Sequence, residues 1–166
     1  AEEVAREVGS SDIAYVQVEA VLAQCDLFLN EGAALQEKTQ KAQKSWAQKE
    51  QNLQAEAAQL QEKYQKGLIT TNDAQAQQQS IEKRVASYQS SAQKEAQALD
   101  EENYVFTNRA QDLLHRAVQE INGDKKYKLI INATALIDAD STLNITPAVL
   151  AKVNELYAAD KKAVKK

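Results

Sequence analysis

The spacing of apolar residues changes along the chain, and the first change separates a strand from a helix. Residues 13–18 (IAYVQV) are rich in β-branched and aromatic residues and are largely apolar on both alternating faces, which predicts a strand buried on two sides. From Glu19 the apolar positions recur at intervals of three and four residues. This spacing predicts one long helix that ends at Lys66.

A short turn with helix-ending and helix-starting signals follows. Gly67 suits the position after a helix C-terminus, and Leu68 is the apolar residue expected just beyond it. Thr70 or Thr71 can cap a second helix, which has the clearest heptad pattern in the sequence and is predicted to end at residues 122–123. Its apolar track consists of Ile81, Val85, Tyr88, Ala92, Leu99, Phe106, Ala110, Leu113 and Ala117.

The residues after the second helix predict two short strands and a last helix. Residues 127–131 (YKLII) are predicted as a strand, residues 132–134 as a turn and residues 135–137 as a shorter strand. Thr146 and Pro147 then fit the N-cap and the first position of a helix.

The order of these elements predicts an α+β fold that is mostly α, with a long antiparallel helical hairpin projecting from a small β-sheet base. The short turn forces the two helices to lie antiparallel, so the strands before and after them meet. Three short strands leave two unpaired edges and bury little apolar surface. We therefore predict a homo-oligomer whose sheets close into a shared barrel. The residues predicted to build its apolar core are Ile13, Tyr15, Val16, Leu129, Ile131, Leu136 and Ile137.

This organisation divides the chain into four parts. Residues 1–12 are predicted to be a disordered acidic leader, with room for a lipid anchor or tether before it. Residues 13–26 and 119–160 form the predicted β-containing oligomerisation body. Residues 27–118 form the predicted helical arm, with its tip near residues 67–72. Residues 161–166 are a basic tail that is predicted to be disordered.

Composition supports long helices and excludes several classes of function. The chain has 166 residues, with 28 alanines but only four glycines and one proline, as is typical of long helices. Its net charge of −4 and pI of about 5.2 argue against a general nucleic-acid binder. No apolar run reaches the roughly 18 residues that a membrane span needs, and the start of the chain lacks the apolar region of a signal peptide.

The polar residues give no pattern that points to catalysis or to a cofactor. His115 is the only histidine and has no partner at a catalytic spacing, so a surface or packing role is expected. Cys25 falls on the apolar track of the first helix and is predicted to be a small buried side chain. Asp138, Asp140 and Asn144 offer oxygen atoms, but turn chemistry explains them better than a calcium loop does.

Two stretches of the chain resemble the Skp (OmpH-type) family of periplasmic chaperones. They are IAYVQVEAVLAQ (residues 13–24) and YKLIINATALIDADSTLNITPAVLAKV (residues 127–153), which bracket the helical hairpin as the corresponding segments do in the family. The resemblance therefore covers nearly the whole chain. The hairpin sequence itself is generic Ala/Gln-rich helix and adds only its length to the match.

The resemblance implies a trimer with a β-barrel body and three helical arms that enclose a cavity. It also implies an ATP-independent holdase that keeps unfolded outer-membrane proteins from aggregating in the periplasm of a Gram-negative bacterium, with no enzyme activity and no cofactor. Familiar members of the family are strongly basic, whereas this chain is acidic. No residue is therefore assigned to contact with lipopolysaccharide or a membrane surface.

A few side chains of the arm are candidates for contact with such a client. Trp46, Leu68 and Ile69 are the candidates, because they are bulky and apolar in a polar region. Tyr64 and Tyr88 lie on the 4-3 track, where a role in the seam between the two helices is favoured.

Three other functions compete with the holdase. A structural or adaptor coiled coil that spaces or tethers partners is the main alternative, although it needs no sheet at its base. A prefoldin-like assembly would place its β-hairpins between the helices, whereas here the helices lie between the strands. An enzyme is the most distant alternative.

Overall fold

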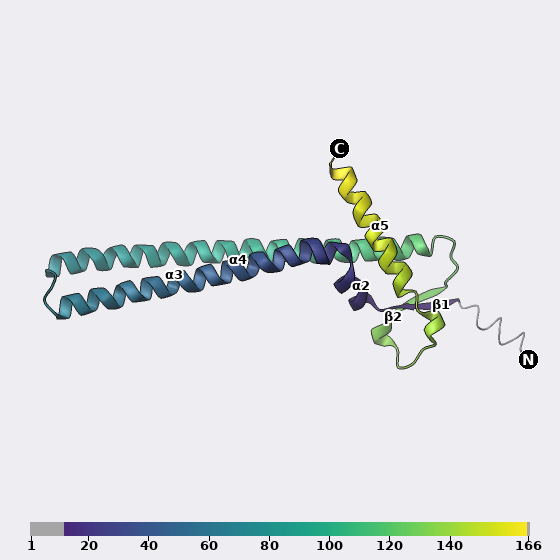
Figure 1. The fold of residues 1–166 in the computed structure, drawn as a ribbon, viewed down its shortest axis with the longest axis horizontal. Helices are drawn as coiled ribbons and strands as arrows, with labels where there is room; N and C mark the ends of the chain where they lie inside the picture. The colour runs from purple at the N-terminus through teal and green to yellow at the C-terminus, as the bar shows by residue number, and fades with distance from the viewer. Residues whose placement is uncertain (1–11, 166) are drawn as a thin grey trace, which may run out of the picture. The chain divides into compact units, whose positions relative to one another are not determined.

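The computed structural model describes residues 12–165, and these form two compact units. The first unit, here called the body, consists of residues 12–33 and 105–165. The second, here called the hairpin, is Ala34–Tyr104. The sequence-based division placed residues 27–33 and 105–118 in the arm, whereas in the structure both segments belong to the body. The fold is mostly helical with a small sheet, as predicted (Figure 1). The predicted acidic leader falls almost entirely outside the described residues.

The sheet of the body has two strands among the described residues. Strand β1 (Ile13–Val16) pairs in parallel with β2 (Leu129–Asn132), with Ile13 opposite Leu129. Parallel strands need a long connection, which is the whole helical segment between them. The predicted strand over residues 135–137 was wrong. The Asn132 side chain accepts a hydrogen bond from the Thr134 amide, and this turn starts a short 3-10 helix, η2 (Ala133–Ala135).

The helix predicted from Glu19 to Lys66 is interrupted near its start, so the prediction of one continuous helix was wrong. Helix α2 (Val18–Gln24) stops where Cys25 adopts extended backbone, with φ −69° and ψ 153°. A π-helical segment, η1 (Phe28–Gly32), precedes α3 (Ala33–Gln65). Gly32 lies close to α4, since a Cβ atom at this position would be 2.9 Å from the end of the Phe106 ring and would displace it. The break allows Leu27 to enter the core, where it is fully buried.

The hydrophobic core of the body joins β1, α2, the end of α4 (Thr71–Ile121) and α5 (Thr146–Val164). All of its largest fully buried side chains are aliphatic apart from one cysteine. The core consists of Val16, Val21, Cys25, Leu27, Leu113, Ala117, Val149, Val153, Leu156 and Tyr157.

The tip of the hairpin has the capping that the sequence predicts. Gly67 has a φ of 69°, in the left-handed region that glycine adopts without strain. The amide of Leu68 donates to the Lys63 carbonyl oxygen, and the amide of Gly67 donates to that of Tyr64, which is the Schellman arrangement. Thr70 caps α4, because its hydroxyl oxygen accepts a hydrogen bond from the Asp73 amide at 3.1 Å.

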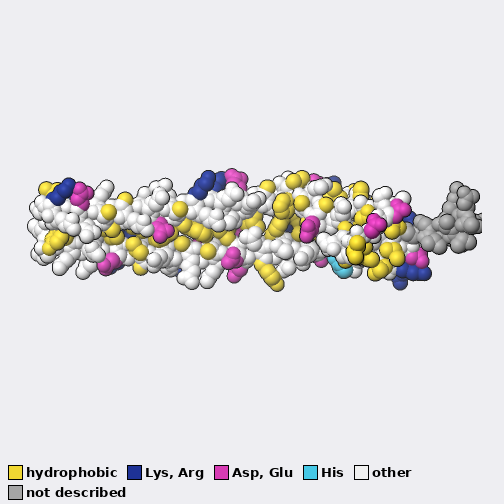
Figure 2. All heavy atoms as spheres, turned by 90° about the horizontal axis from the view of Figure 1, so that it is seen from below, with side chains coloured by type: hydrophobic (Ala, Val, Ile, Leu, Met, Phe, Trp, Pro, Cys, Tyr) yellow, Lys and Arg dark blue, Asp and Glu magenta, His cyan; other side chains and the backbone are white. Residues whose placement is uncertain are grey.

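The two helices of the hairpin pack side by side and antiparallel. Contacts between them occur in reverse order along the two helices: Lys38 pairs with Glu102, Trp46 with Glu95, and Glu56 with Arg84. The predicted heptad track of α4 is buried or half-buried at every position in the hairpin, with Leu99 only 4% exposed. In the space-filling view, apolar side chains lie among polar ones along the hairpin (Figure 2).

The last helix is longer than predicted and begins differently. Ile145 is the N-cap of α5, whereas Thr146 was predicted; the Thr146 hydroxyl oxygen instead accepts a hydrogen bond from the Gln17 amide at 2.9 Å. Pro147 lies in the first turn, as expected. Residues 161–164 of the tail are helical, so the prediction of disorder was wrong for them.

Candidate functional site

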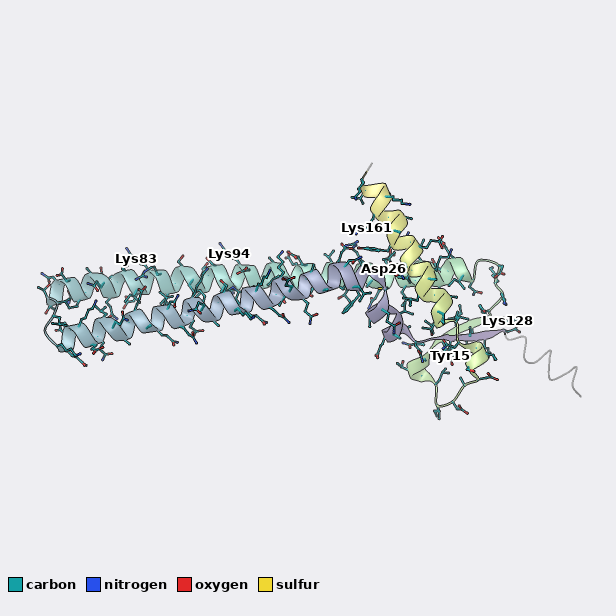
Figure 3. The ribbon with its side chains drawn as sticks, in the orientation of Figure 1. Tyr15, Asp26, Lys83, Lys94, Lys128 and Lys161 are labelled. Atoms are coloured by element: carbon teal, nitrogen blue, oxygen red, sulfur yellow. The ribbon has the colours of Figure 1, made fainter. Side chains whose placement is uncertain are left out.

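The outward face of the two-stranded sheet gathers four of the seven residues predicted to build an oligomer core. Side chains alternate along a strand, and Ala14 and Val16 are buried on the side of the body core. Ile13 and Tyr15 therefore point the other way. Their register partners Leu129 and Ile131 share that face. Figure 3 labels Tyr15 on β1 and Lys128 just before β2, and Figure 2 shows apolar side chains exposed beside the grey N-terminal residues.

This outward sheet face, defined by Ile13, Tyr15, Leu129 and Ile131, is only partly covered. Ile13 is 46% exposed and Leu129 is 50% exposed, while Tyr15 and Ile131 are half-buried. Exposed apolar side chains side by side on a sheet are typical of an interaction surface.

The other three predicted core residues lie elsewhere. Val16 is 2% exposed and packs into the chain's own core, on the opposite face of the sheet. Leu136 is half-buried after η2. Ile137 is fully exposed in the loop that follows.

The two edges of the sheet differ in how they are covered. On one side of β1, Tyr15 forms a bridge with Asn144, and the Ile145 amide donates to the Tyr15 carbonyl oxygen at 3.0 Å. Strand β2 has no second neighbour within the described part of the chain. An unpaired edge of this kind is a template for pairing with another strand.

An apolar cleft of about 360 Å³ lies between the sheet and α4 of the body. The lining is mostly aliphatic, with three polar side chains. It consists of Val16, Val18, Gln111, Leu114, His115, Val118, Ile130, Ile131 and Asn132. Since Ile131 belongs to both surfaces, the cleft and the outward sheet face meet at β2.

Away from the outward sheet face, ion pairs connect α5 and η1 of the body to α4. Arg116 donates two hydrogen bonds to the Asp160 carboxylate, at 2.9 and 3.2 Å, and they hold the pKa of this carboxyl below its ordinary value of 3.8. Arg109 binds Glu31 in the same way, at 3.0 and 3.3 Å, and lowers the pKa of Glu31 below 4.5. These contacts are structural, because each cation is matched by a carboxylate.

The hairpin surface exposes a few apolar side chains near its tip. Leu68 is 69% exposed and Ile69 is half-buried. Tyr64, for which a seam position was favoured, is 49% exposed. Trp46 is half-buried; its indole N–H donates to Glu95 at 2.7 Å, and its carbonyl oxygen accepts from the Tyr88 hydroxyl at 3.1 Å. Trp46 and Tyr88 thus join the two helices, while Leu68 and Tyr64 are available to a partner.

Sequence reasoning missed four exposed apolar residues. Phe28 and Leu29 continue the track of the first helix, but the break at Cys25 changes the direction of their side chains, and they are 40% and 58% exposed. Tyr104 and Val105 are 70% and 56% exposed. They directly precede Phe106 on α4 but are not on the heptad track. Their position off this track was the sequence signal for their exposure.

The polar residues singled out in the sequence have local structural roles. Cys25 is 1% exposed, as predicted. His115 is exposed and lies 3.2 Å from the Gln119 side chain. Asp140 accepts a hydrogen bond from the Thr142 amide, which lowers the pKa of its carboxyl. Within residues 12–165, no group of His, Cys, Asp or Glu side chains could hold a metal ion.

Comparison with known proteins decides the family. The model of the family described as "Outer membrane protein (OmpH-like)" matches residues 12–153. The chain belongs to the OmpH-like family. The match includes both strands, the whole hairpin and the first part of α5. The comparison with curated proteins gives no match.

A solved structure supports the fold of this OmpH-like chain. It is that of a Caulobacter crescentus protein described as an outer membrane chaperone (OmpH-like). The TM-score is 0.74, with 16% sequence identity over 88% of this chain and 85% of the other. At this identity the similarity establishes the shared fold. None of the helices in the described residues combines the length and apolarity required to span a bilayer.

Proposed function

We propose that this OmpH-like chain is an ATP-independent holdase that keeps unfolded outer-membrane proteins from aggregating in the periplasm of a Gram-negative bacterium. The observation that carries the proposal is the family match over residues 12–153, which includes the entire helical hairpin. The similar Caulobacter protein is described as an outer membrane chaperone, which agrees with this function.

The surface of the hairpin suits weak and adaptable binding. Most of its side chains are polar and exposed. Basic and acidic side chains of the hairpin form ion pairs with each other, so its surface has no large excess of positive or negative charge. A few apolar side chains, such as Leu68 and Tyr64, are exposed among them. An unfolded membrane protein exposes apolar segments and strand edges that aggregate, and a surface of this kind shields them through many weak contacts.

The proposed active form is a homotrimer assembled through the outward sheet face. Ile13 and Leu129 are each about half exposed on that face, and β2 has an unpaired edge in the described chain. Closing three sheets around an axis would cover both features at once. The enclosed space between three hairpins would then receive the client.

Aggregation assays test the proposal directly. An outer-membrane β-barrel protein is diluted from urea, and light scattering is recorded with and without the chain. We expect scattering to be abolished near one trimer per client, without nucleotide. A helical coiled-coil protein of similar length is the control. Unchanged scattering would contradict the holdase and favour a structural or adaptor coiled coil.

Variants of the hairpin locate the client contacts. Leu68→Ser with Ile69→Ser is expected to weaken protection severalfold, because it removes exposed apolar area at the tip. Trp46→Ala tests the third candidate and also removes the hydrogen bond to Glu95. If Trp46→Ala changes neither the protection nor the oligomer mass, Trp46 is not a contact.

A further inference from the structure

The last turns of α5 continue the core-facing side of this helix beyond the core itself. Val153 and Tyr157 are buried in the core of the body. Three, four, seven and eight positions after Tyr157, on the same side of the helix, follow Asp160, Lys161, Val164 and Lys165. Val164 is 87% exposed, so no described part of the chain covers this end of the helix side.

A cleft of about 670 Å³ lies beside this end of α5, and we call it the α5 cleft. Most of its lining comes from residues 157–165, with Glu31 of η1 and Arg109 of α4 on the other side. It shares no lining residue with the apolar cleft beside β2. Sites for small ligands have volumes of about 300–1,000 Å³, so the α5 cleft has room for the end of a peptide. Figure 3 labels Lys161 on this part of α5.

The α5 cleft has an excess of positive charge in a chain whose net charge is −4. Its two carboxylates are already matched, since Glu31 pairs with Arg109 and Asp160 pairs with Arg116. Lys161 and Lys165 also line the cleft, and neither forms an ion pair with another described residue. Two unmatched ammonium groups beside one cleft attract an anion.

The wall of the cleft combines an aromatic ring with hydrogen-bonding groups that are not fully used. The Lys161 amine lies 5.0 Å from the centre of the Tyr157 ring. Arg109 chiefly, and the Tyr157 hydroxyl to a smaller degree, lower the pKa of Glu31, yet no hydrogen bond of ordinary geometry joins this buried hydroxyl to a described residue. Arg109 donates two of its five N–H groups to Glu31, and its side chain is 49% exposed. The cleft therefore keeps free donors next to an apolar surface.

We propose that the α5 cleft binds the C-terminal end of a peptide whose last residue is apolar. Lys161, Lys165 and the free N–H groups of Arg109 bind the terminal carboxylate. The apolar side chain of the last residue lies against Val164 and the Tyr157 ring. This site goes beyond the proposed holdase function, because it lies on the body and includes no residue of the hairpin.

The acidic groups of the cleft favour a peptide over a free fatty acid. The Glu31 and Asp160 carboxylates are 38% and 47% exposed and have lone pairs that their arginine partners do not use. They can accept hydrogen bonds from peptide N–H groups, whereas a fatty acid has no N–H group to donate.

The spacing of charge and apolar surface favours a chain end over an acidic side chain. Lys161 and Val164 are three residues apart on α5, so their side chains are neighbours, about 5–6 Å apart at Cβ. In the last residue of a peptide the carboxylate and the side chain share one Cα atom. A single residue can therefore contact both groups.

Peptide binding to the full chain tests the proposal. The probe is a hexapeptide of glycine and serine that ends in leucine and phenylalanine, carries fluorescein at its N-terminus and is followed by fluorescence anisotropy. We expect saturable binding that weakens in 1 M salt. The same peptide with a C-terminal amide should bind about tenfold more weakly, because it lacks the charge. A peptide that ends in serine should bind severalfold more weakly, because it lacks the apolar side chain.

Three variants locate the site. Lys161→Gln with Lys165→Gln is expected to weaken binding about tenfold. Lys162→Gln is the matched control, because Lys162 is an exposed lysine of the same helix that does not line the cleft, and it should leave the affinity unchanged. Val164→Ser should reduce the preference for phenylalanine over serine at the peptide end. All these side chains are exposed, so the helical circular dichroism should be preserved.

Four results would overturn the proposal. The absence of saturable binding would exclude the site, and equal affinity for the free acid and the amide would exclude carboxylate recognition. An equal loss in the Lys162→Gln control would show nonspecific attraction to the basic end of the chain. Decanoate that displaces the probe at a lower concentration than the unlabelled peptide would show a fatty-acid site. The assay contains no unfolded protein, so its outcome is independent of holdase activity.

Discussion

At the scale of single residues, stability depends on a small number of completely buried side chains. Leu27 is the largest fully buried one, and it lies in the short stretch between the end of α2 and η1. Its neighbour Leu29 is 58% exposed. Two leucines separated by one residue thus occupy opposite environments, because the backbone at Cys25 leaves the helical conformation. The spacing of apolar residues pointed to the wrong leucine, because Leu29 continues the apolar track of the first helix and Leu27 does not.

Leu27→Ala is therefore expected to destabilise the body by about 2–5 kcal/mol, since it removes buried apolar area and leaves a cavity. Leu29→Ala is the matched control and is expected to change the free energy of unfolding by less than about 0.5 kcal/mol. Urea denaturation followed by circular dichroism gives both values. Equal losses in the two variants would contradict the assignment of Leu27 to the core.

The ion pair of Asp160 with Arg116 gives a prediction on pH. The pKa of Asp160 is lower in the folded chain than in the unfolded one, so its stabilisation is present at neutral pH and is lost as the pH falls below about 4. Both side chains are more than a third exposed, and solvent screening therefore limits the effect of Asp160→Asn at pH 7 to roughly 0.5 kcal/mol. We expect this difference to shrink as the pH falls below 3.8, the ordinary pKa of this carboxyl, and to shrink in 1 M salt. A difference independent of pH would show that the charge is not its cause.

At the scale of elements, the sequence predicted what local chemistry determines. The tip of the hairpin follows from Gly67 and Thr70, whose roles depend on nearby backbone groups alone. The break at Cys25 and the loss of the third strand were not predicted. The break at Cys25 is accompanied by contacts with a distant part of the chain, such as Gly32 against Phe106. The third strand was lost for a local reason, because the turn predicted at residues 132–134 starts a 3-10 helix that extends to Ala135. The four residues of the outward sheet face were among those predicted to build the oligomer core. The sequence did not show that Val16 faces the opposite side of the sheet, which follows from the strand register and from burial in the structure.

The end of α3 gives the prediction at this scale. Gly67→Ala is expected to destabilise the hairpin by about 1 kcal/mol, because a residue with a Cβ atom is strained at a φ of 69°. A Cβ atom there would meet nothing within 4 Å, so steric crowding does not contribute. Gly67→Asn is the matched variant and should lose less, since asparagine tolerates this conformation. Thermal unfolding of the full chain measures both, and a larger loss for Asn than for Ala would contradict the explanation.

At the scale of the whole molecule, assembly and client protection are expected to fail together. Leu129→Asp places a charge on the outward sheet face, where Leu129 is 50% exposed and contributes nothing to the body core. The single chain should therefore keep its helical circular dichroism, while the solution mass falls from about 55 kDa to 18.4 kDa. Protection of an unfolded outer-membrane protein should then be lost as well, because one hairpin encloses no space. Leu68→Asp is the matched control at the tip, and it should keep the mass and reduce protection only in part. If Leu129→Asp became monomeric and still protected its client in full, the cavity between three hairpins would not be the site of protection.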